Sequence, residues 1–421
     1  MAKYTKFIKW LYPGLRIKRW IVLLVLGIGL ILTSSIYFSY FHYFWWRLFY
    51  FILFISGIVF FISGTYLLIQ SFFKAIFPHQ EKELIDIIYE KRYLSRGPKI
   101  VAIGGGTGLS TILEGLKEFT SNITAIVAVT DEGGSSGRLR KELGILPPGD
   151  IRNCLVALAE APQLMRDLFQ YRFREGNGIK GHSFGNLLIT ALAEVTGSFQ
   201  EAIEESSKVL AIRGKVLPAS LEKIRLKAEY IDGTIKEGED EIPKGEKPIR
   251  RLTLVPSSVK AFPQAVKGIK EADLIILGPG SLFTSVLPNL LIEEIKEAII
   301  LRKDILKIYI CNVMTQHGET DNFTAFDHVE TVINHTNKEI INTCLVNCGS
   351  LPQDLLIKYA QEKSFPVIPD TYKIKEKGIF VIEKDIVSHH NYLRHDPYKT
   401  ARCIIEFYNN YKKGWKGLRK K

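Results

Sequence analysis

Cysteine is scarce in this 421-residue chain, which has five cysteines, at positions 154, 311, 344, 348 and 403. Their spacing does not predict a zinc site, and in a cytoplasmic chain they would stay reduced, so we expect them to be packing residues. The chain also lacks a His-Glu-x-x-His motif, and nothing indicates a zinc peptidase. Phosphoryl-type transfer needs no distinctive nucleophile, so this chemistry stays open.

Acidic side chains are missing from both ends of the chain. Residues 1–19 and 411–421 each carry six Lys or Arg and no Asp or Glu. The rest of the chain has equal numbers of basic and acidic residues, so the net charge of +12 does not indicate nucleic-acid binding. Basic clusters gain about 1 kcal/mol per Lys or Arg at an anionic cytoplasmic leaflet. We expect the tail to lie on the membrane with Trp415 as a partial anchor; a solvated tail is the alternative.

Charged side chains are also missing from two long apolar runs, residues 20–46 and 48–73. Each run exceeds the roughly 20 residues that span a bilayer as a helix. A signal peptide or a core helix would also be apolar, but no small-residue cleavage site is present and a second run follows at once. The runs predict a membrane-spanning hairpin. Because residues 1–19 are basic, both termini and the main domain should be cytoplasmic.

These patterns divide the chain into five segments. We expect a basic N-terminus at 1–19, a transmembrane hairpin at 20–73 with spans at about 20–41 and 48–70, a linker helix at 74–97, one domain at 98–410 and a basic tail at 411–421.

Within the domain, β-branched runs alternate with helical patterns. The strand-like runs cover residues 99–103, 123–129, 274–277, 308–312 and 343–346. This alternation predicts an α/β fold with a Rossmann-like, doubly wound, mainly parallel sheet. Polar and apolar residues alternate within 215–257, which predicts an antiparallel hairpin insertion, and 237–247 reads as an exposed charged loop.

A glycine-rich turn follows the first of these runs. Gly104, Gly105, Gly106 and Gly108 let the chain turn sharply into a helix and bring backbone N–H groups close to a ligand. The N-terminus of that helix favours an anion, so the natural ligand group is a phosphate. No Gly-Lys-Ser/Thr follows, which disfavours a nucleotide-hydrolase loop. A purely structural turn is the alternative.

Two further loops follow the second run. Asp131 and Glu132 stand where a dinucleotide fold places its ribose-binding acid, but residues 133–140 then form a flexible, hydroxyl-rich loop with Arg138 and Arg140. Guanidinium groups can grip phosphate or carboxylate oxygens, although surface arginines would look the same. The third loop places Asp150 as the N-cap of the next helix.

Three later segments suit the same edge of the sheet. Residues 278–281 let backbone amides approach an anion, and residues 315–321 offer amides and hydroxyls for a sugar or base. Glu319 and Asp321 would bind a divalent ion, orient a hydroxyl or cap the helix over 323–335. In the segment 181–186, His182 would transfer a proton or serve as a buried hydrogen-bonding residue.

The ordered motifs of the domain resemble those of a known family. GGGTGLS, DEGGSSGRLR, LPPGDIRN, GHSFGNLL, LGPGSLFTS and NVMTQHGETD look like the motifs of YvcK-type gluconeogenesis factors, which share a superfamily with the 2-phospho-L-lactate transferase CofD. The chain departs from the usual pattern at Glu132, where the family has a second aspartate, and at His317, where it has proline. Glu132 keeps the charge, whereas His317 loosens a turn that proline would stiffen.

This resemblance implies a regulatory protein that binds UDP-N-acetylglucosamine and supports cell shape and wall synthesis during gluconeogenic growth. The alternative is a CofD-like transferase acting on a deazaflavin acceptor, with Mg²⁺ held by acids such as Asp131. The motifs resemble those of the gluconeogenesis factors more than those of the transferase, which favours a non-catalytic role. The expected partners are cell-wall synthesis proteins and a second copy of the chain.

The ligand-binding residues that we expect come from all of these segments. They are Gly104, Gly105, Gly106, Thr107, Gly108, Asp131, Gly133, Gly134, Ser135, Ser136, Arg138, Asp150, Asn153, His182, Asn186, Gly278, Gly280, Ser281, Asn312, Thr315, Gln316 and Glu319.

Overall fold

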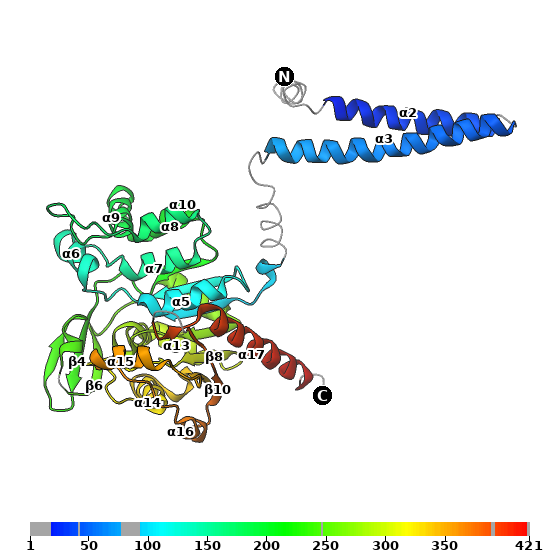
Figure 1. Cartoon of the computed structure of the whole chain (residues 1–421). Coiled ribbons are helices and arrows are strands. Elements are labelled where there is room, and N and C mark those ends of the chain that lie inside the picture. Colours follow the sequence, from blue (N-terminus) through cyan, green and yellow to red (C-terminus); the bar gives the residue numbers. More distant parts are fainter. Residues whose placement is uncertain (1–17, 41–42, 77–92, 246, 389–391, 419–421) are drawn as a thin grey trace. The chain divides into compact units, whose positions relative to one another are not determined.

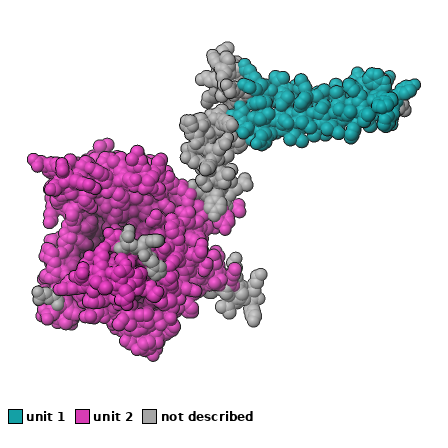
Figure 2. Space-filling model, viewed as in Figure 1, with its two compact units in different colours: residues 1–91 teal, residues 92–421 magenta. Residues whose placement is uncertain are grey.

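The computed structural model describes residues 18–40, 43–76, 93–245, 247–388 and 392–418. They fall into two compact units, Met1–Lys91 and Arg92–Lys421 (Figure 2). Most of the predicted basic N-terminus and of the predicted linker helix lies outside the described residues, and so does the side chain of Trp415.

The first unit is a pair of apolar helices, α2 (Lys18–Tyr40) and α3 (Phe44–Ile76), which lie side by side (Figure 1). Glycines line their contact: a Cβ added to Gly27 would lie 2.7 Å from the backbone nitrogen of Phe61, and one added to Gly64 would lie 3.0 Å from that of Leu24. Small residues therefore let the two backbones touch. Most outward side chains are exposed and apolar, and both helices are long and apolar enough to cross a membrane.

The second unit is built on a seven-stranded parallel sheet. Its strand order is β10-β9-β8-β7-β1-β2-β3. The bounds are β1 (Ile100–Gly104), β2 (Ile123–Val127), β3 (Lys215–Pro218), β7 (Leu274–Leu277), β8 (Leu306–Ile310), β9 (Thr343–Asn347) and β10 (Phe380–Lys384). The chain runs outward from β1 to β3 and then returns to β7 on the other side of β1. The point between β1 and β7 is therefore where the winding reverses, and ligands bind there in such sheets.

Helices cover both faces of the sheet, as the alternation of sequence patterns predicts (Figure 1). One face packs against α5 (Gly106–Leu116), α7 (Gly149–Leu158), α8 (Gln163–Gln170), α9 (Phe184–Thr196), α10 (Phe199–Val209) and α17 (Pro397–Leu418). The other face packs against α11 (Pro263–Glu271), α12 (Leu287–Leu290), α13 (Glu293–Leu301), α14 (Ala325–His335) and α16 (Thr371–Glu376). The central strands β1, β7 and β8 are buried on both faces, so they read as near-continuous apolar runs.

Shorter elements complete the unit. They are α6 (Gly134–Leu143), α15 (Gln353–Gln361), the 3₁₀ turns η2 (Leu94–Arg96), η3 (Ile242–Lys244) and η5 (Lys338–Ile340), the π-helical turn η4 (Leu282–Val286), and the two-stranded pair β11 (Val387–Ser388) and β12 (Arg394–His395).

A three-stranded antiparallel sheet forms the insertion, with β4 (Arg225–Tyr230) between β5 (Ile235–Glu237) and β6 (Ile249–Val255). The predicted α/β fold with an antiparallel insertion is confirmed. Two details of the prediction were wrong. Residues 215–218 belong to the main sheet as β3, and residues 133–140 lie mostly in helix α6 rather than in a flexible loop.

Candidate functional site

The first site loop joins β1 to α5. Gly106 begins α5 with a φ of +61°, a left-handed conformation that glycine adopts readily. A Cβ added to Gly108 would lie 2.5 Å from the carbonyl oxygen of Pro279, so only glycine lets this helix approach the loop after β7. The N-terminal turn of α5 thus faces the switch point of the sheet with its positive dipole end.

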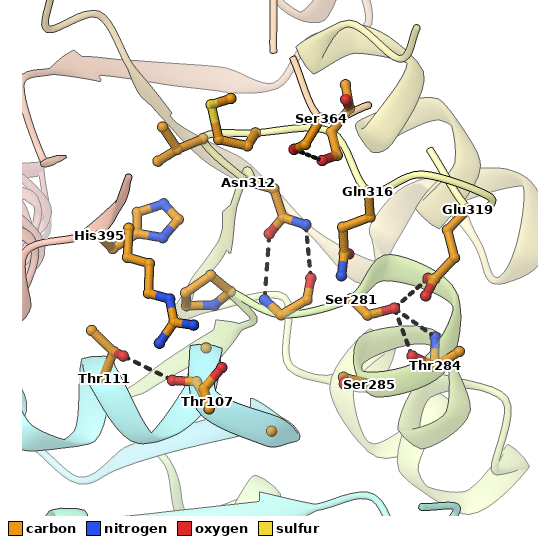
Figure 3. Close-up of a pocket in the computed structure, with 18 of the residues that line it drawn as sticks. Thr107, Thr111, Ser281, Thr284, Ser285, Asn312, Gln316, Glu319, Ser364 and His395 are labelled. Carbon is orange, nitrogen blue, oxygen red and sulfur yellow. Dashed lines mark hydrogen bonds between the residues drawn. The ribbon is translucent and has the colours of Figure 1, made fainter. Parts of the chain in front are cut away.

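The second site loop follows β7 and is held by the end of β8. The Asn312 side chain donates to the Gly280 carbonyl at 2.9 Å (Figure 3). Ser281 caps η4, since its hydroxyl accepts from the Thr284 N–H at 3.1 Å, and it also donates to the Glu319 carboxylate. These bonds fix the distance between the loops after β7 and β8.

Between these loops lies a cavity of about 410 Å³, which we call the switch-point pocket. Ten of the expected ligand-binding residues line it: Gly105, Gly106, Thr107, Gly108, Gly280, Ser281, Asn312, Thr315, Gln316 and Glu319. Val313, Met314, Tyr359 and Leu393 give it an apolar end. The side-chain oxygen of Gln316 is buried and has no hydrogen-bond partner among the described residues.

The other expected residues do not line this pocket. Gly104 ends β1, and Gly278 follows β7 directly. Asn153 lines a different groove, and Gly133 and Gly134 begin α6.

Arg138 and Arg140 also point elsewhere. Arg138 donates to the Lys180 carbonyl at 2.8 Å, and Arg140 donates to the Ile224 carbonyl and lies 3.8 Å from the Glu132 carboxylate.

Four expected residues meet in a buried polar network around Arg152. The Arg152 guanidinium donates to Ser183 and, at 2.8 Å, to the Asn186 side-chain oxygen. The Asn186 amide donates to Ser135 at 3.1 Å and to Ser136 at 3.4 Å, and Ser135 lies 3.0 Å from His182 Nδ1. His182 is thus placed as a buried hydrogen-bonding residue.

Two stretches match the hydrolase pattern Gly-x-Ser-x-Gly, at residues 133–137 and 181–185. Neither is a nucleophile elbow in the structure. Ser135 lies inside α6, while Ser183 caps α9, where its hydroxyl accepts from the Asn186 N–H at 3.1 Å. Both serines are nearly fully buried, so neither can reach a substrate carbonyl.

Acidic side chains gather between the pocket and the network. The Asp150 carboxylate accepts from the Gly106 N–H, and burial, aided by the charge of Asp131, raises the pKa of Asp150 to about 7. Burial also raises the pKa values of Asp131 and Glu239.

The prediction that Asp150 caps α7 was wrong, because Pro148 is the N-cap and Asp150 reaches back to α5. Glu319 and Asp321 do not cap α14 either; Thr324 does, in a capping box with Asp327.

These acids should make the stability of the domain depend on pH. Between about pH 4 and about pH 7, folded Asp150 keeps a proton that unfolded Asp150 has released. The free energy of unfolding should therefore fall as the pH rises through this window and level off above it. Chemical unfolding at about pH 5 and about pH 8 measures the change, and Asp150→Asn should reduce it. A pH profile that is the same in Asp150→Asn and in the exposed control Asp167→Asn would contradict this assignment.

Several lining residues were missed in the sequence: Thr111, Glu239, Tyr359, Ser364, Arg394 and His395. Glu239 belongs to the loop that we expected to be exposed, but it is half-buried at the pocket. Arg394 is the one Lys or Arg among the described residues that line the pocket. Burial lowers the pKa of His395 to about 4, so its neutral ring donates to the Cys311 carbonyl at 3.1 Å.

Of the cysteines, Cys154, Cys311 and Cys344 are buried as expected, but Cys348 is exposed.

Known proteins resemble this chain over most of its length. Residues 100–387 match the family described as 2-phospho-L-lactate transferase CofD. A putative gluconeogenesis factor from Nostoc is 45% identical over 96% of this chain and 93% of its own length. The gluconeogenesis factor of Bacillus subtilis is 48% identical over 74% of this chain and 99% of its own length.

A crystal structure of a upf0052 family member from Bacillus halodurans has a TM-score of 0.72 and 49% identity. It covers 74% of this chain and 99% of that chain. The Nostoc relative therefore aligns with the apolar helices as well, whereas the domain occurs without them in the other two. With this match and these relatives, the chain belongs to the CofD family, and within it to the gluconeogenesis factors.

Proposed function

We propose that the domain binds a nucleotide diphosphate sugar of the UDP-N-acetylglucosamine type and acts as a regulatory factor in cell-wall synthesis and cell shape. The observation that carries this proposal is the switch-point pocket, in which the N-terminus of α5 and the Arg394 guanidinium face the same space. A diphosphate matches this pair, because both elements favour negative charge.

The remaining lining suggests how the ligand would lie. The apolar end at Val313, Met314 and Tyr359 suits the face of a base. Asn312 and Gln316 offer amide groups to sugar hydroxyls or to an N-acetyl group, and Gln316 has an oxygen without a partner. Neither amide carries a charge, which suits a neutral sugar.

The CofD-like transferase is the second candidate, and it would place Mg²⁺ at Asp131. The residues do not fit this ion well. Asp131 Oδ1 accepts from the Gly133 N–H at 2.9 Å, and its carboxylate also accepts from Ser136. Within the described ranges, no group of three or more His, Cys, Asp or Glu side chains is arranged to hold a metal. The cation that faces these acids is Arg152, whose charge lowers the pKa values of Asp131 and Asp150 against the larger effect of burial.

Calorimetric titration of the full chain in detergent with UDP-N-acetylglucosamine tests the proposal. We expect saturable binding at one site. The same protein is then supplied with a nucleotide-linked phospholactate donor and a deazaflavin alcohol. Turnover of the acceptor without binding of the UDP-sugar would overturn the regulatory proposal in favour of the transferase.

We further propose that α2 and α3 form a membrane hairpin with the domain in the cytoplasm, close to membrane-bound wall-synthesis partners. Labelling with a membrane-impermeant maleimide in intact cells tests the orientation. A cysteine introduced by Tyr43→Cys, between the helices, should react from outside. The exposed native Cys348 should react only after the membrane is opened, and it serves as the internal control. The reverse pattern would refute the orientation.

A further inference from the structure

A second polar groove of about 320 Å³ lies between α5, α7 and α8. We call it the α5–α8 groove. It meets the switch-point pocket at Thr111, which lines both. Its other walls include Lys117, Asn153, Gln163, Arg166 and Gln170. The proposed function uses none of these residues.

Two cationic side chains of the groove have unused hydrogen-bond donors. Lys117 is 8% exposed, and its ammonium group donates to the carbonyls of Ala157 at 2.8 Å and Ala159 at 3.1 Å, which leaves a third N–H. Arg166 donates to Gln163 at 2.6 Å, but its Nε is sealed from water without a partner. Among the described residues, no carboxylate forms an ion pair with either side chain.

These two cations also lie close enough to repel each other. Burial lowers the pKa of Lys117, and the charges of Arg166 and Arg213 lower it further, while Glu114 and Glu118 act in the opposite direction. An anionic group bound between them would offset this repulsion and accept from the third Lys117 N–H and from the Arg166 guanidinium.

Neutral and acidic groups surround the cations. The Asn153 oxygen accepts from Arg152 at 2.9 Å, so the Asn153 amide N–H groups are left for a ligand. Gln170 and Thr111 add further polar groups, and Glu114 and Asp167 offer oxygens that can accept from hydroxyls. The lining carries two cations and two acids, so it suits a ligand that combines an anionic group with hydroxyls.

We propose that the α5–α8 groove is a second binding site, which takes a small hydroxyl-bearing anion such as a sugar phosphate or a hydroxycarboxylate. Its walls are connected to the first pocket by α5, since Thr111 lines both, and the Asn153–Arg152 bond links them to the buried polar network. A ligand in the groove would therefore contact α5, the helix whose N-terminus faces the switch-point pocket.

Isothermal titration of the full chain in detergent tests this site, with glucose 6-phosphate, citrate and inorganic phosphate as probes. We expect saturable binding of glucose 6-phosphate or citrate, tighter than that of inorganic phosphate. Arg166→Gln should weaken it about tenfold, because a charge-assisted hydrogen bond is lost. Gln163→Ala, an exposed change that removes the partner of Arg166, should also weaken binding, because the guanidinium is then no longer held in place.

Two control variants locate the binding. The exposed Arg174→Gln removes the same charge outside the groove, and Arg394→Gln removes the cation of the switch-point pocket. Neither should change the affinity for glucose 6-phosphate. The proposal is overturned by absence of binding of every probe, by equal affinity for inorganic phosphate, or by a loss in Arg394→Gln that matches the loss in Arg166→Gln. A loss of affinity for glucose 6-phosphate that is confined to Arg166→Gln and Gln163→Ala supports the proposal, whether or not the chain binds the UDP-sugar.

Discussion

Replacing Arg394 with glutamine should weaken UDP-N-acetylglucosamine binding roughly 10- to 100-fold, because a charge-assisted hydrogen bond contributes about 1.5–3 kcal/mol. Arg394 is the one Lys or Arg among the described pocket-lining residues, and the arginines of α6 have protein partners instead. A diphosphate in the pocket would therefore lose its main side-chain counter-charge. Calorimetric titration of wild type and variant measures the change in Kd.

Lys358 offers a matched control for this experiment. The Lys358 ammonium and the Arg394 guanidinium each lie 5.1 Å from the centre of the Tyr392 ring, but Lys358 does not line the pocket. Lys358→Gln should therefore leave the affinity nearly unchanged. An equal loss in both variants would indicate a general electrostatic effect, and an unchanged Arg394→Gln variant would place the phosphates elsewhere.

The second large effect should come from Arg152→Met, which we expect to lower the free energy of unfolding by about 3–5 kcal/mol. Arg152 is 7% exposed, and burial lowers its pKa to about 10, yet its charge compensates Asp131 and Asp150. Methionine would keep the volume but leave these acids without a cation. It would also strip Ser183 and Asn186 of a donor. Urea unfolding at about pH 8, above the pKa of Asp150, followed by far-ultraviolet circular dichroism, measures the loss.

A second substitution can show that the loss comes from the uncompensated acids. Asp131→Asn removes one of the two negative charges, so the double variant with Arg152→Met should recover part of the stability. Arg166→Met is a control on a neighbouring helix and should cost much less, because Arg166 forms no ion pair with a described acid. If Arg152→Met costs less than about 1 kcal/mol, the network does not depend on that charge.

The central strands could be predicted from the sequence, whereas the edge strands could not. β1, β2, β7, β8 and β9 are buried on both faces and appear as apolar runs. The outermost strands β3 and β10 contain lysine and are partly exposed, so no clear run marks them. Their place in the sheet follows from pairing with β2 and β9, which no local pattern encodes.

Helix α6 shows how tertiary contact overrides local preference. Its first turn contains two glycines and two serines, which favour a loop. A Cβ added to Gly137 would lie 1.8 Å from the Glu132 carbonyl, so the helix forms where only a glycine fits against the preceding loop. In this helix Arg138 and Arg140 donate to the carbonyls of Lys180 and Ile224, and neither lines the pocket.

The site was predictable as far as it is built from glycine loops at strand ends. Gly106, Gly108, Gly280 and Asn312 each follow a β-branched run, and the topology brings those strand ends together. Arg394 comes from the far end of the domain, in a short strand with no motif around it. Only the three-dimensional structure places this cation opposite the first loop.

The position of β1 in the sheet has a consequence for synthesis of the chain. β1 pairs with β2, which follows soon after it, and with β7, which a ribosome delivers only after most of the intervening domain. Until then β1 presents an open, apolar edge, and such edges pair readily with other chains. The nascent domain thus passes through an interval in which it is prone to aggregate, and protection of that edge by a chaperone would be most valuable before residue 274 emerges.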